Sequence, residues 1–592
     1  MRRLLYPVLV VLIAVLAINC QREINFDGDE PPVVTVTPPA PITSTVQGIV
    51  TDENNQPASG VAIKVGSKTA TTNSRGYFRI VNASLDKNAS LVIAEKAGYF
   101  KALRSFQATS GANHIAMKLI KKTLAGTINS SAGGDVTLTN GAKITLPANA
   151  VVKAAGGSYS GTINVYAAYI DPTASDIAQA VPGSFMADDK TGKRVILTSY
   201  GMLAVELESA AGEKLQIAAD KTATLTAPIP SSIAASAPAT LPLWYVDEQT
   251  GLWKEEGTAT KTGNTYSGTV KHFSFWNYDI GGNAINLSVT LKDVEAAPLV
   301  HVQVKITRLT GWGGAAYGYT DSLGKVSGLV PSAELLKLDV LDNCGNSIYT
   351  QNIGPFTANT DLGVITVTSP TSSMLTIKGT VLNCAGAVVT NGYAIVDYDG
   401  YPRYVSTNSS GLFSLSVTRC AASPTTCDIT VVDNVAQQQG TVTAVPIVVP
   451  ITNAGNILAC GTSAVQFFNY TLNGTNYALS STVPQDSLIA YTSQQGSTPF
   501  YTQFYGLNIG ANKSISLQFS SPAAAAGTYP ITYMTAQNHN ATAPIAPSNV
   551  IITSFPVSAG GFFEGSFSGS YKDSTNLSIT HTVSGTFRLR RL

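Results

Sequence analysis

The heptapeptide Thr72-Asn73-Ser74-Arg75-Gly76-Tyr77-Phe78 decides the fold of this chain, because related copies of it return twice. The second copy runs from Thr320 to Val326 as T-D-S-L-G-K-V, and the third runs from Thr407 to Phe413 as T-N-S-S-G-L-F. Asn, Asp and Ser side chains hydrogen-bond to their own backbone, and Gly adopts a positive φ without strain. Each copy therefore predicts a tight turn that leads into a β-strand.

Short runs of alternating apolar and polar residues flank each turn, which is the pattern of β-strands. The first copy follows Gly48-Ile49-Val50-Thr51-Asp52 and the group Pro57, Gly60 and Val61. This block closely resembles the carboxypeptidase regulatory-like domain, and the other two copies look like divergent members. The resemblance implies a transthyretin-like seven-stranded sandwich without catalytic residues. None of the five histidines has Glu three residues on, so the sequence does not predict a zinc peptidase.

Composition supports an all-β chain and excludes several functional classes. The chain has 592 residues, of which 12% are charged, and its 37 Lys+Arg against 36 Asp+Glu give a net charge of +1. Coiled coils need Glu/Lys-rich faces, and disordered chains need high charge with few aromatic residues. Nucleic-acid binders need a basic excess. We therefore expect no nucleic-acid partner.

The N-terminus predicts export. Arg2 and Arg3 precede an apolar run from Leu4 to Ala17, which is too short to span a membrane and is typical of a signal peptide. Leu16-Ala17-Ile18-Asn19-Cys20 resembles the relaxed lipobox of Bacteroidetes lipoproteins, which implies lipidation of Cys20. The alternative is a plain cleaved signal peptide. The acidic, Pro-rich segment behind Cys20 resembles a surface-export signal and also suits a semi-rigid tether. We expect a lipid anchor in the outer membrane facing the cell surface, with the periplasmic face or secretion as alternatives.

Five further cysteines lie in the second half of the chain, and an odd number cannot pair completely within one chain. Cys420 and Cys427 flank a turn-like segment and are expected to form a disulfide. Cys384 and Cys460 are expected to join the two ends of one domain, which would leave Cys344 free. No C-x-x-C pair occurs, so we expect no zinc site and no other metal.

The segment Lys271-His272-Phe273-Ser274-Phe275-Trp276 carries the sharpest chemical motif. It closes a stretch that resembles the β-domain of zonula-occludens proteins, ankyrins and netrin receptors, on the evidence of its start at Gly133–Leu138 and Gly141–Ala150. In self-cleaving members of that family His-Phe-Ser is the cleavage site. The resemblance implies that His272 deprotonates Ser274, which attacks the carbonyl of Phe273. The alternative is a core strand in which Phe273 and Phe275 face inward.

A second candidate site is aromatic. Trp312, in a Gly-rich stretch, and the nearby Tyr317 and Tyr319 would display rings for stacking on a sugar. The alternative is that Trp312 folds back as a plug. No nucleophile elbow, P-loop or dinucleotide fingerprint occurs, so we expect no cofactor.

These observations predict a string of Ig-like and transthyretin-like β-sandwiches behind a signal peptide and a tether. The expected segments are a signal peptide at 1–19, a tether at 20–43, sandwiches at 44–121, 284–370, 371–462 and 463–592, and the zonula-occludens-like domain at 122–283. The predicted function is a lipid-anchored, adhesin-like surface binding or scaffold protein without classical catalysis, whose partners are the membrane and a surface protein or glycan. The alternatives are a glycan-capturing lipoprotein of a polysaccharide-uptake system and a protein that cleaves itself between Phe273 and Ser274.

Overall fold

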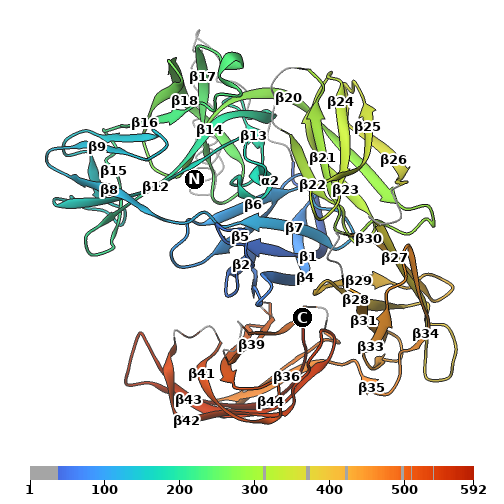
Figure 1. Cartoon of the computed structure of the whole chain (residues 1–592). Helices are drawn as coiled ribbons and strands as arrows, with labels where there is room; N and C mark the ends of the chain where they lie inside the picture. The colour runs from blue at the N-terminus through green and yellow to red at the C-terminus, as the bar shows by residue number, and fades with distance from the viewer. Residues whose placement is uncertain are drawn as a thin grey trace, which may run out of the picture.

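The computed structural model describes residues 38–310, 315–368, 374–419, 424–483, 485–494, 499–508, 510–537, 539 and 541–592. The predicted all-β fold class is confirmed, because the described residues form strands joined by turns, apart from the short helix α2 (Ile177–Ala180) and the 3-10 turn η1 (Ala234–Ser236). We describe the strands in five groups, called modules 1 to 5, which span residues 38–121, 122–283, 284–368, 374–462 and 463–592 (Figure 1).

The three repeated turns have one geometry, and it explains their sequence. Oδ1 of Asn73 accepts hydrogen bonds from the backbone N–H of Arg75 and Tyr77, at 2.9 and 3.0 Å. Asp321 and Asn408 bind the equivalent N–H groups of their own turns. The Gly of each copy has a φ between 71° and 78°. The hydrogen bonds and the positive φ confirm why Asn or Asp and Gly recur at these places.

Module 1 is a sandwich of two sheets, ordered β4-β1-β7 and β3-β2-β5-β6, around a core that includes Val46, Phe78 and Val92. Modules 3 and 4 repeat the three-stranded layer, as β26-β20-β23 and β30-β27-β34. In each of these layers a parallel pair lies beside an antiparallel one. The module 1 strands are β1 (Pro41–Thr51), β2 (Ala62–Val65), β3 (Lys68–Thr71), β4 (Tyr77–Asp86), β5 (Ser90–Glu95), β6 (Ala102–Phe106) and β7 (Asn113–Lys118).

Module 2 is built on the long strands β14 and β20, with Trp244, Trp253 and Trp276 fully buried. Trp244 and Trp253 lie on the paired strands β17 and β18. Its strands are β8 (Leu124–Asn129), β9 (Gly134–Thr137), β10 (Lys143–Leu146), β11 (Val151–Lys153), β12 (Thr162–Ile170), β13 (Met186–Asp188), β14 (Arg194–Ser209), β15 (Lys214–Ile217), β16 (Ala223–Pro228), β17 (Thr240–Val246), β18 (Trp253–Thr262), β19 (Thr265–Val270) and β20 (Phe275–Lys292).

Strand β20 belongs to two modules. Its first half pairs with β14 and β17 of module 2, and its second half pairs with β23 and β26 of module 3. The boundary expected between residues 283 and 284 therefore falls inside a continuous strand. The other strands of module 3 are β21 (Gln303–Arg308), β22 (Ala316–Tyr319), β23 (Lys325–Pro331), β24 (Leu336–Leu341), β25 (Ser347–Ile353) and β26 (Thr360–Thr366).

Module 4 packs its three-stranded layer on a second sheet built around β28 and β31. Its strands are β27 (Met374–Leu382), β28 (Gly392–Tyr398), β29 (Tyr401–Ser406), β30 (Leu412–Thr418), β31 (Thr426–Asp433), β32 (Gln438–Gln439), β33 (Thr443–Pro446), β34 (Ile451–Leu458) and β35 (Thr462–Ser463).

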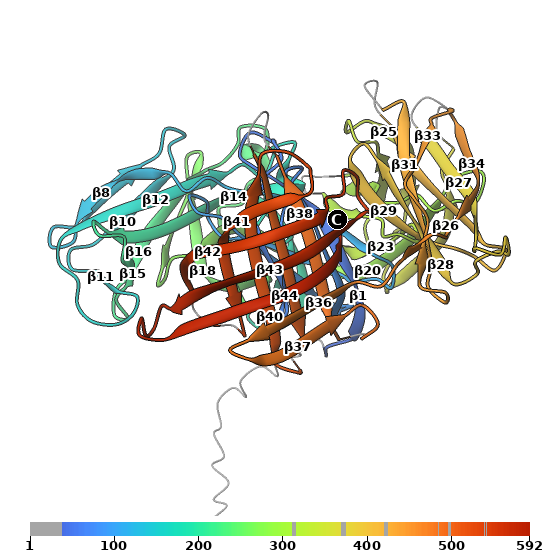
Figure 2. The same ribbon diagram turned by 90° about the horizontal axis from the view of Figure 1, so that it is seen from below.

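Module 5 is one antiparallel sheet in the order β37-β36-β44-β43-β42-β41-β40-β39-β38, and its core is rich in Phe. Its strands are β36 (Phe467–Leu472), β37 (Thr475–Ser480), β38 (Ser487–Ser493), β39 (Phe500–Asn508), β40 (Lys513–Ser521), β41 (Gly527–Ala536), β42 (Ala541–Ser554), β43 (Phe562–Asp573) and β44 (Thr580–Arg590). Figure 2 shows this sheet in front of module 1 and part of module 2, with modules 3 and 4 beside it.

The string of modules folds back on itself, so that module 1 contacts all four others (Figure 1). Lys118 pairs with Asp176 of module 2 at 2.6 Å, and Thr109 donates to Asp321 of module 3 at 2.7 Å. The guanidinium of Arg79 lies 3.7 Å from the ring centre of Tyr404 of module 4. Ile489 and Tyr491 of module 5 join the hydrophobic core of module 1. Module 1 is therefore the hub of the molecule.

Candidate functional site

The described part of the chain contains a cavity of about 140 Å³ where modules 1, 2 and 3 meet. Strands β6 and β7 of module 1 form one wall, α2, β13 and β14 of module 2 form the second, and β20 to β23 of module 3 form the third. Most of the lining is apolar, and it includes Phe185, Leu287 and Leu329. The cavity is thus a product of module packing rather than of any single module.

Arg104 brings a positive charge to this cavity. It sits on β6 opposite Val92, and it is 9% exposed. Its Nε and Nη2 atoms are buried and have no hydrogen-bond partner among the described residues. Burial lowers the pKa of Arg104 to about 10, although the nearby Tyr319 hydroxyl opposes that shift. At neutral pH the guanidinium is therefore still charged.

A pair of stacked histidines lies at the polar end of the cavity. The rings of His114, which lines the cavity, and His301 are 4.4 Å apart, and Tyr319 meets His114 edge-on at 5.2 Å. Gln47 accepts from the Tyr77 hydroxyl and lies 2.7 Å from Nε2 of His301, so the amide NH₂ faces that ring. Nε2 of His301 must then act as an acceptor, which requires a neutral ring. Burial lowers the pKa of both histidines, to about 3 for His114.

Two of the three predicted aromatic residues line the cavity instead of standing on an exposed loop. Tyr317 and Tyr319 lie on β22 and are half-buried. The Tyr319 hydroxyl accepts hydrogen bonds from Gln179 and Gln303, at 3.0 and 3.1 Å. Trp312 lies outside the described residues. Tyr317 and Tyr319 therefore form no exposed platform for a sugar ring, because their strand is covered by modules 1 and 2.

The side chains of His272 and Ser274 make no hydrogen bond with each other in the structure, and each has other partners. The Ser274 hydroxyl donates to the carbonyl oxygen of Phe275 at 3.1 Å, and the His272 ring packs against Tyr245 and Trp276. Phe273 is buried, and the Gln216 side chain bonds both its N–H and its carbonyl oxygen, at 3.1 and 3.3 Å. Burial also lowers the pKa of His272, which weakens it as a base. This geometry does not favour self-cleavage.

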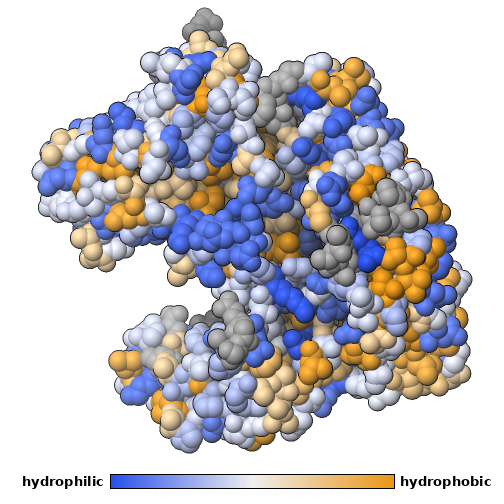
Figure 3. Space-filling model, viewed as in Figure 1, coloured by the Kyte–Doolittle hydropathy of each residue, from blue (hydrophilic) through white to orange (hydrophobic). Residues whose placement is uncertain are grey.

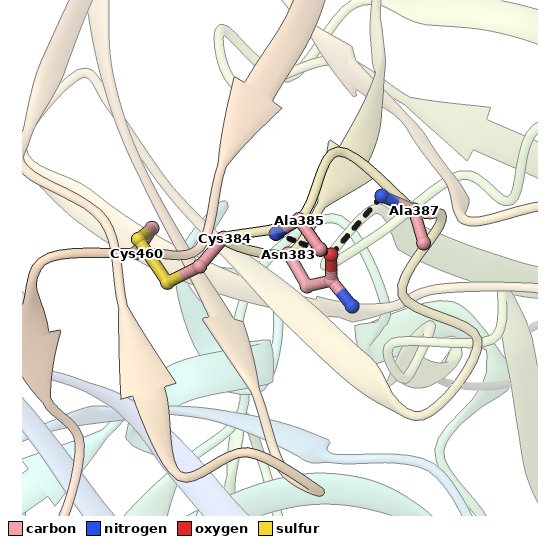
Figure 4. Close-up of a disulfide and its surroundings, with 5 residues drawn as sticks. All are labelled: Asn383, Cys384, Ala385, Ala387 and Cys460. Atoms are coloured by element: carbon pink, nitrogen blue, oxygen red, sulfur yellow. Dashed lines mark hydrogen bonds between the residues drawn. A yellow bond between two sulfur atoms is a disulfide. The ribbon is translucent and has the colours of Figure 1, made fainter.

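The cysteine pairing differs from the expectation in one respect. Cys384 and Cys460, one of the two pairs considered from the sequence, form a disulfide near the ends of β27 and β34 (Figure 4). Cys427 is a free thiol buried in the core of module 4, so the expected disulfide with Cys420 is wrong; Cys420 itself lies outside the described residues. Cys344, expected to be free, is disulfide-bonded. Cys427 lies on β31 with its side chain in the core of module 4, so the turn-like sequence beside it does not bring it to a partner.

A wider groove of about 450 Å³ separates module 1 from module 5. Lys64, Glu95 and Lys101 line it from module 1, and Tyr491 and Tyr505 line it from module 5. Figure 3 shows the molecule hollowed between its lower part, which is module 5, and the modules above. This groove has mixed charge and aromatic side chains, whereas the three-module cavity has a single buried cation.

Sequence reasoning missed Arg104, although a signal was present. In the strand Ala102-Leu103-Arg104-Ser105-Phe106, Arg104 lies on the same face as Ala102 and Phe106. Both of these residues pack against the core of module 1. A charged residue at an inward position of a strand indicates a special environment. The sequence alone does not reveal that modules 2 and 3 cover it.

The described residues contain no group of three His, Cys, Asp or Glu side chains arranged to hold a metal ion. No helix in the described part of the chain has both the length and the apolar character needed to cross a membrane.

Curated relatives match only a part of the chain. No family model matches the chain. Cartilage intermediate layer protein 2 of Homo sapiens is 29% identical over 126 residues, and that of Mus musculus is 26% identical over 154 residues. These matches cover 21% and 25% of this chain, and the chain spans 10% and 13% of those proteins.

The solved structures that match parts of the chain include bacterial pilins and a carbohydrate-binding module. A minor pilin of Streptococcus agalactiae matches 30% of this chain and 97% of its own, with 10% identity and a TM-score of 0.14. A carbohydrate-binding module of Eubacterium rectale, solved with maltoheptaose, matches 29% of this chain and 93% of its own, with 13% identity and a TM-score of 0.12. TM-scores this low carry no argument about what the chain does.

Proposed function

We propose that this chain is a lipid-anchored, adhesin-like binding and scaffold protein of the cell surface, which presents its modules as one fixed body. The observation that carries the proposal is the hub arrangement, in which module 1 contacts every other module through buried or part-buried side chains. A fixed array of sandwiches offers an extended outer surface without needing a catalytic centre.

Contacts among the modules around the hub also favour fixed over hinged modules. Asp293 of module 3 accepts hydrogen bonds from the Thr376 and Ser416 hydroxyls of module 4, and all three residues are buried. Gln439 of module 4 donates to the Gly560 carbonyl oxygen of module 5 at 2.6 Å. These hydrogen bonds between modules are lost if the modules separate, and each contributes about 0.5–1.5 kcal/mol, because water then replaces the partner. The disulfide Cys384–Cys460 suits an oxidising compartment outside the cytoplasm.

The test is labelling of intact cells with an amine reagent that does not cross membranes. The Lys214 side chain is 71% exposed, so surface display predicts that Lys214 is modified on whole cells while a periplasmic marker is not. The Cys20→Ser variant should lose its lipid and leave the membrane fraction. Labelling of Lys214 only after lysis would contradict surface display, and a Cys20→Ser protein that stays in the membrane fraction would contradict the lipid anchor.

A further inference from the structure

We propose that the cavity between modules 1, 2 and 3 binds a small carboxylic acid with an apolar body, whose carboxylate pairs with Arg104. This site goes beyond the proposed surface function and does not depend on where the chain is displayed.

Arg104 carries a buried positive charge that lacks a partner among the described residues. The guanidinium is more than nine-tenths buried, and Nε and Nη2 have no acceptor among the described residues. No Asp or Glu occurs among the described residues that line the cavity. A buried charge without a partner is strongly unfavourable, so proteins pair such charges. An anionic ligand would supply the missing acceptors.

Other buried arginines of the chain have partners, which sets Arg104 apart. Arg403 donates to the carbonyl oxygen of Tyr398 at 2.8 Å and to Asp399 at 3.0 Å. Arg588 pairs with Glu564 at 2.7 Å. Arg590 also has unpaired nitrogen atoms, but its guanidinium lies 5.0 Å from the ring centre of Phe562. Among the described residues, Arg104 has neither an acceptor nor an aromatic ring facing it, and it lines a cavity.

The size and walls of the cavity define the rest of the ligand. A volume of about 140 Å³ is close to that of an engineered cavity of about 150 Å³ that binds benzene. Much of the lining is apolar, with Val181 and Ile196 from module 2 and Val304 and Val330 from module 3. A ligand with an apolar body about the size of benzene and one charged end therefore fits the cavity.

The single cation favours a carboxylate over a phosphate. A guanidinium binds a carboxylate through two parallel hydrogen bonds, and one positive charge balances one negative charge. A phosphate dianion would bring a second negative charge into a cavity whose other polar side chains, such as Ser105 and Gln107, already bond to protein partners.

The experiment measures thermal unfolding of the purified mature protein with sodium benzoate. Benzoate should raise the midpoint temperature in a saturable manner, because a ligand that binds the folded state stabilises it by RT ln(1 + [L]/Kd). Benzyl alcohol, which lacks the charge, and inorganic phosphate, which lacks the apolar body, should produce no saturable shift. No saturable shift with benzoate, or a shift with phosphate alone, would overturn the assignment.

Variants separate binding from folding. Arg104→Met should raise the Kd for benzoate at least tenfold without lowering the midpoint temperature of the free protein, because it removes an unpaired buried charge. Ala316→Phe keeps Arg104 but fills the cavity from β22, and it should abolish the shift as well. Arg79→Met, on β4 of the same module and outside the cavity lining, is the matched control and should keep the full shift. An equal benzoate shift in Arg104→Met and in the unaltered protein would show that Arg104 is not the site.

Discussion

Asp321 shows how one residue serves two modules at once. In its own turn Oδ1 binds the N–H groups of Leu323 and Lys325, as Asn73 and Asn408 do in the other copies. Its second oxygen, Oδ2, accepts from the Thr109 hydroxyl at 2.7 Å and from the Gly111 N–H at 3.0 Å. A Cβ on Gly111 would lie 2.3 Å from Oδ2, so only Gly allows this approach. The carboxylate therefore joins module 3 to module 1.

Replacing Asp321 by Asn tests this second role. The amide keeps an oxygen for the turn, but its NH₂ group then faces two donors in module 1. We expect the free energy of unfolding to fall by about 1–3 kcal/mol, since a buried polar pair is broken. Unfolding in denaturant measures this change in the free energy of unfolding. Asn408→Asp is the matched control: Asn408 is exposed, and its turn binds only its own backbone, so the change should stay within about 0.5 kcal/mol. Equal effects at 321 and 408 would contradict the role.

Single residues show which features can be predicted from the sequence and which cannot. The hydrogen bonds of Asn73 and the positive φ of Gly76 follow from residue type, because both are local. The second partner of Asp321 and the burial of Arg104 do not, because they depend on which modules touch. Cys427 was misassigned for a related reason: its neighbours in sequence suggest a turn, whereas its position on β31 points it into the core.

At the scale of elements, β7 and the segment before β21 hold the stacked pair His114 and His301. Arg403 of module 4 lies close enough to both rings to lower their pKa further, and Tyr319 and Gln47 complete the surroundings. No carboxylate in the described part of the chain raises the pKa of either ring. The surroundings of this pair, which come from modules 1, 3 and 4, therefore keep both histidines neutral in the folded protein.

The pair His114 and His301 predicts that the free energy of unfolding falls in mild acid. A histidine with a lowered folded pKa binds protons more readily when unfolded, so its contribution is complete above about pH 6.5 and falls below that value. Each such histidine costs about 1.4 kcal/mol per pH unit below pH 6.5. Urea unfolding should therefore show a less stable protein at pH 5.5 than at pH 7.5. The unfolded-state carboxylates titrate mainly below this window.

The His114→Gln variant is the control for that measurement. It removes one titrating ring from the stack, so the difference in stability between pH 7.5 and pH 5.5 should shrink by about 1 kcal/mol. A difference that is the same in the variant and in the unaltered protein would assign the acid sensitivity to other groups. His272 and His539, whose pKa values are also lowered by burial, would be the next to replace.

At the scale of the whole molecule, the hub predicts a compact particle. A compact chain of 592 residues has a radius of gyration of about 25 Å, whereas five modules in a straight row would give roughly 50 Å. Small-angle X-ray scattering of the mature protein should give a value near the lower figure. Added salt should leave it unchanged, because apolar residues such as Ile489 and Tyr491 hold module 5 on module 1. A value near the upper figure would contradict the hub.

The succession of modules along the chain can be predicted from the sequence, but the contacts between modules cannot. Alternating strands and repeated turns are local signals, and they predict that β-sandwiches follow one another. The cavity between modules 1, 2 and 3 needs walls whose residues lie up to about 225 positions apart in sequence, from Arg104 through Phe185 to Leu329. One sequence without relatives carries no signal of such distant pairings.

Strand β20 has a practical consequence for anyone who dissects the protein. Because one strand runs without interruption from module 2 into module 3, a recombinant fragment that ends at residue 283 would keep the pairs of β20 with β14 and β17 but would lose the strand that fixes module 3 to module 2. The carbonyl oxygen of Asn283 would also lose its hydrogen bond from the N–H of Ser332. Modules 2 and 3 should therefore be expressed, exchanged or tagged as a single unit.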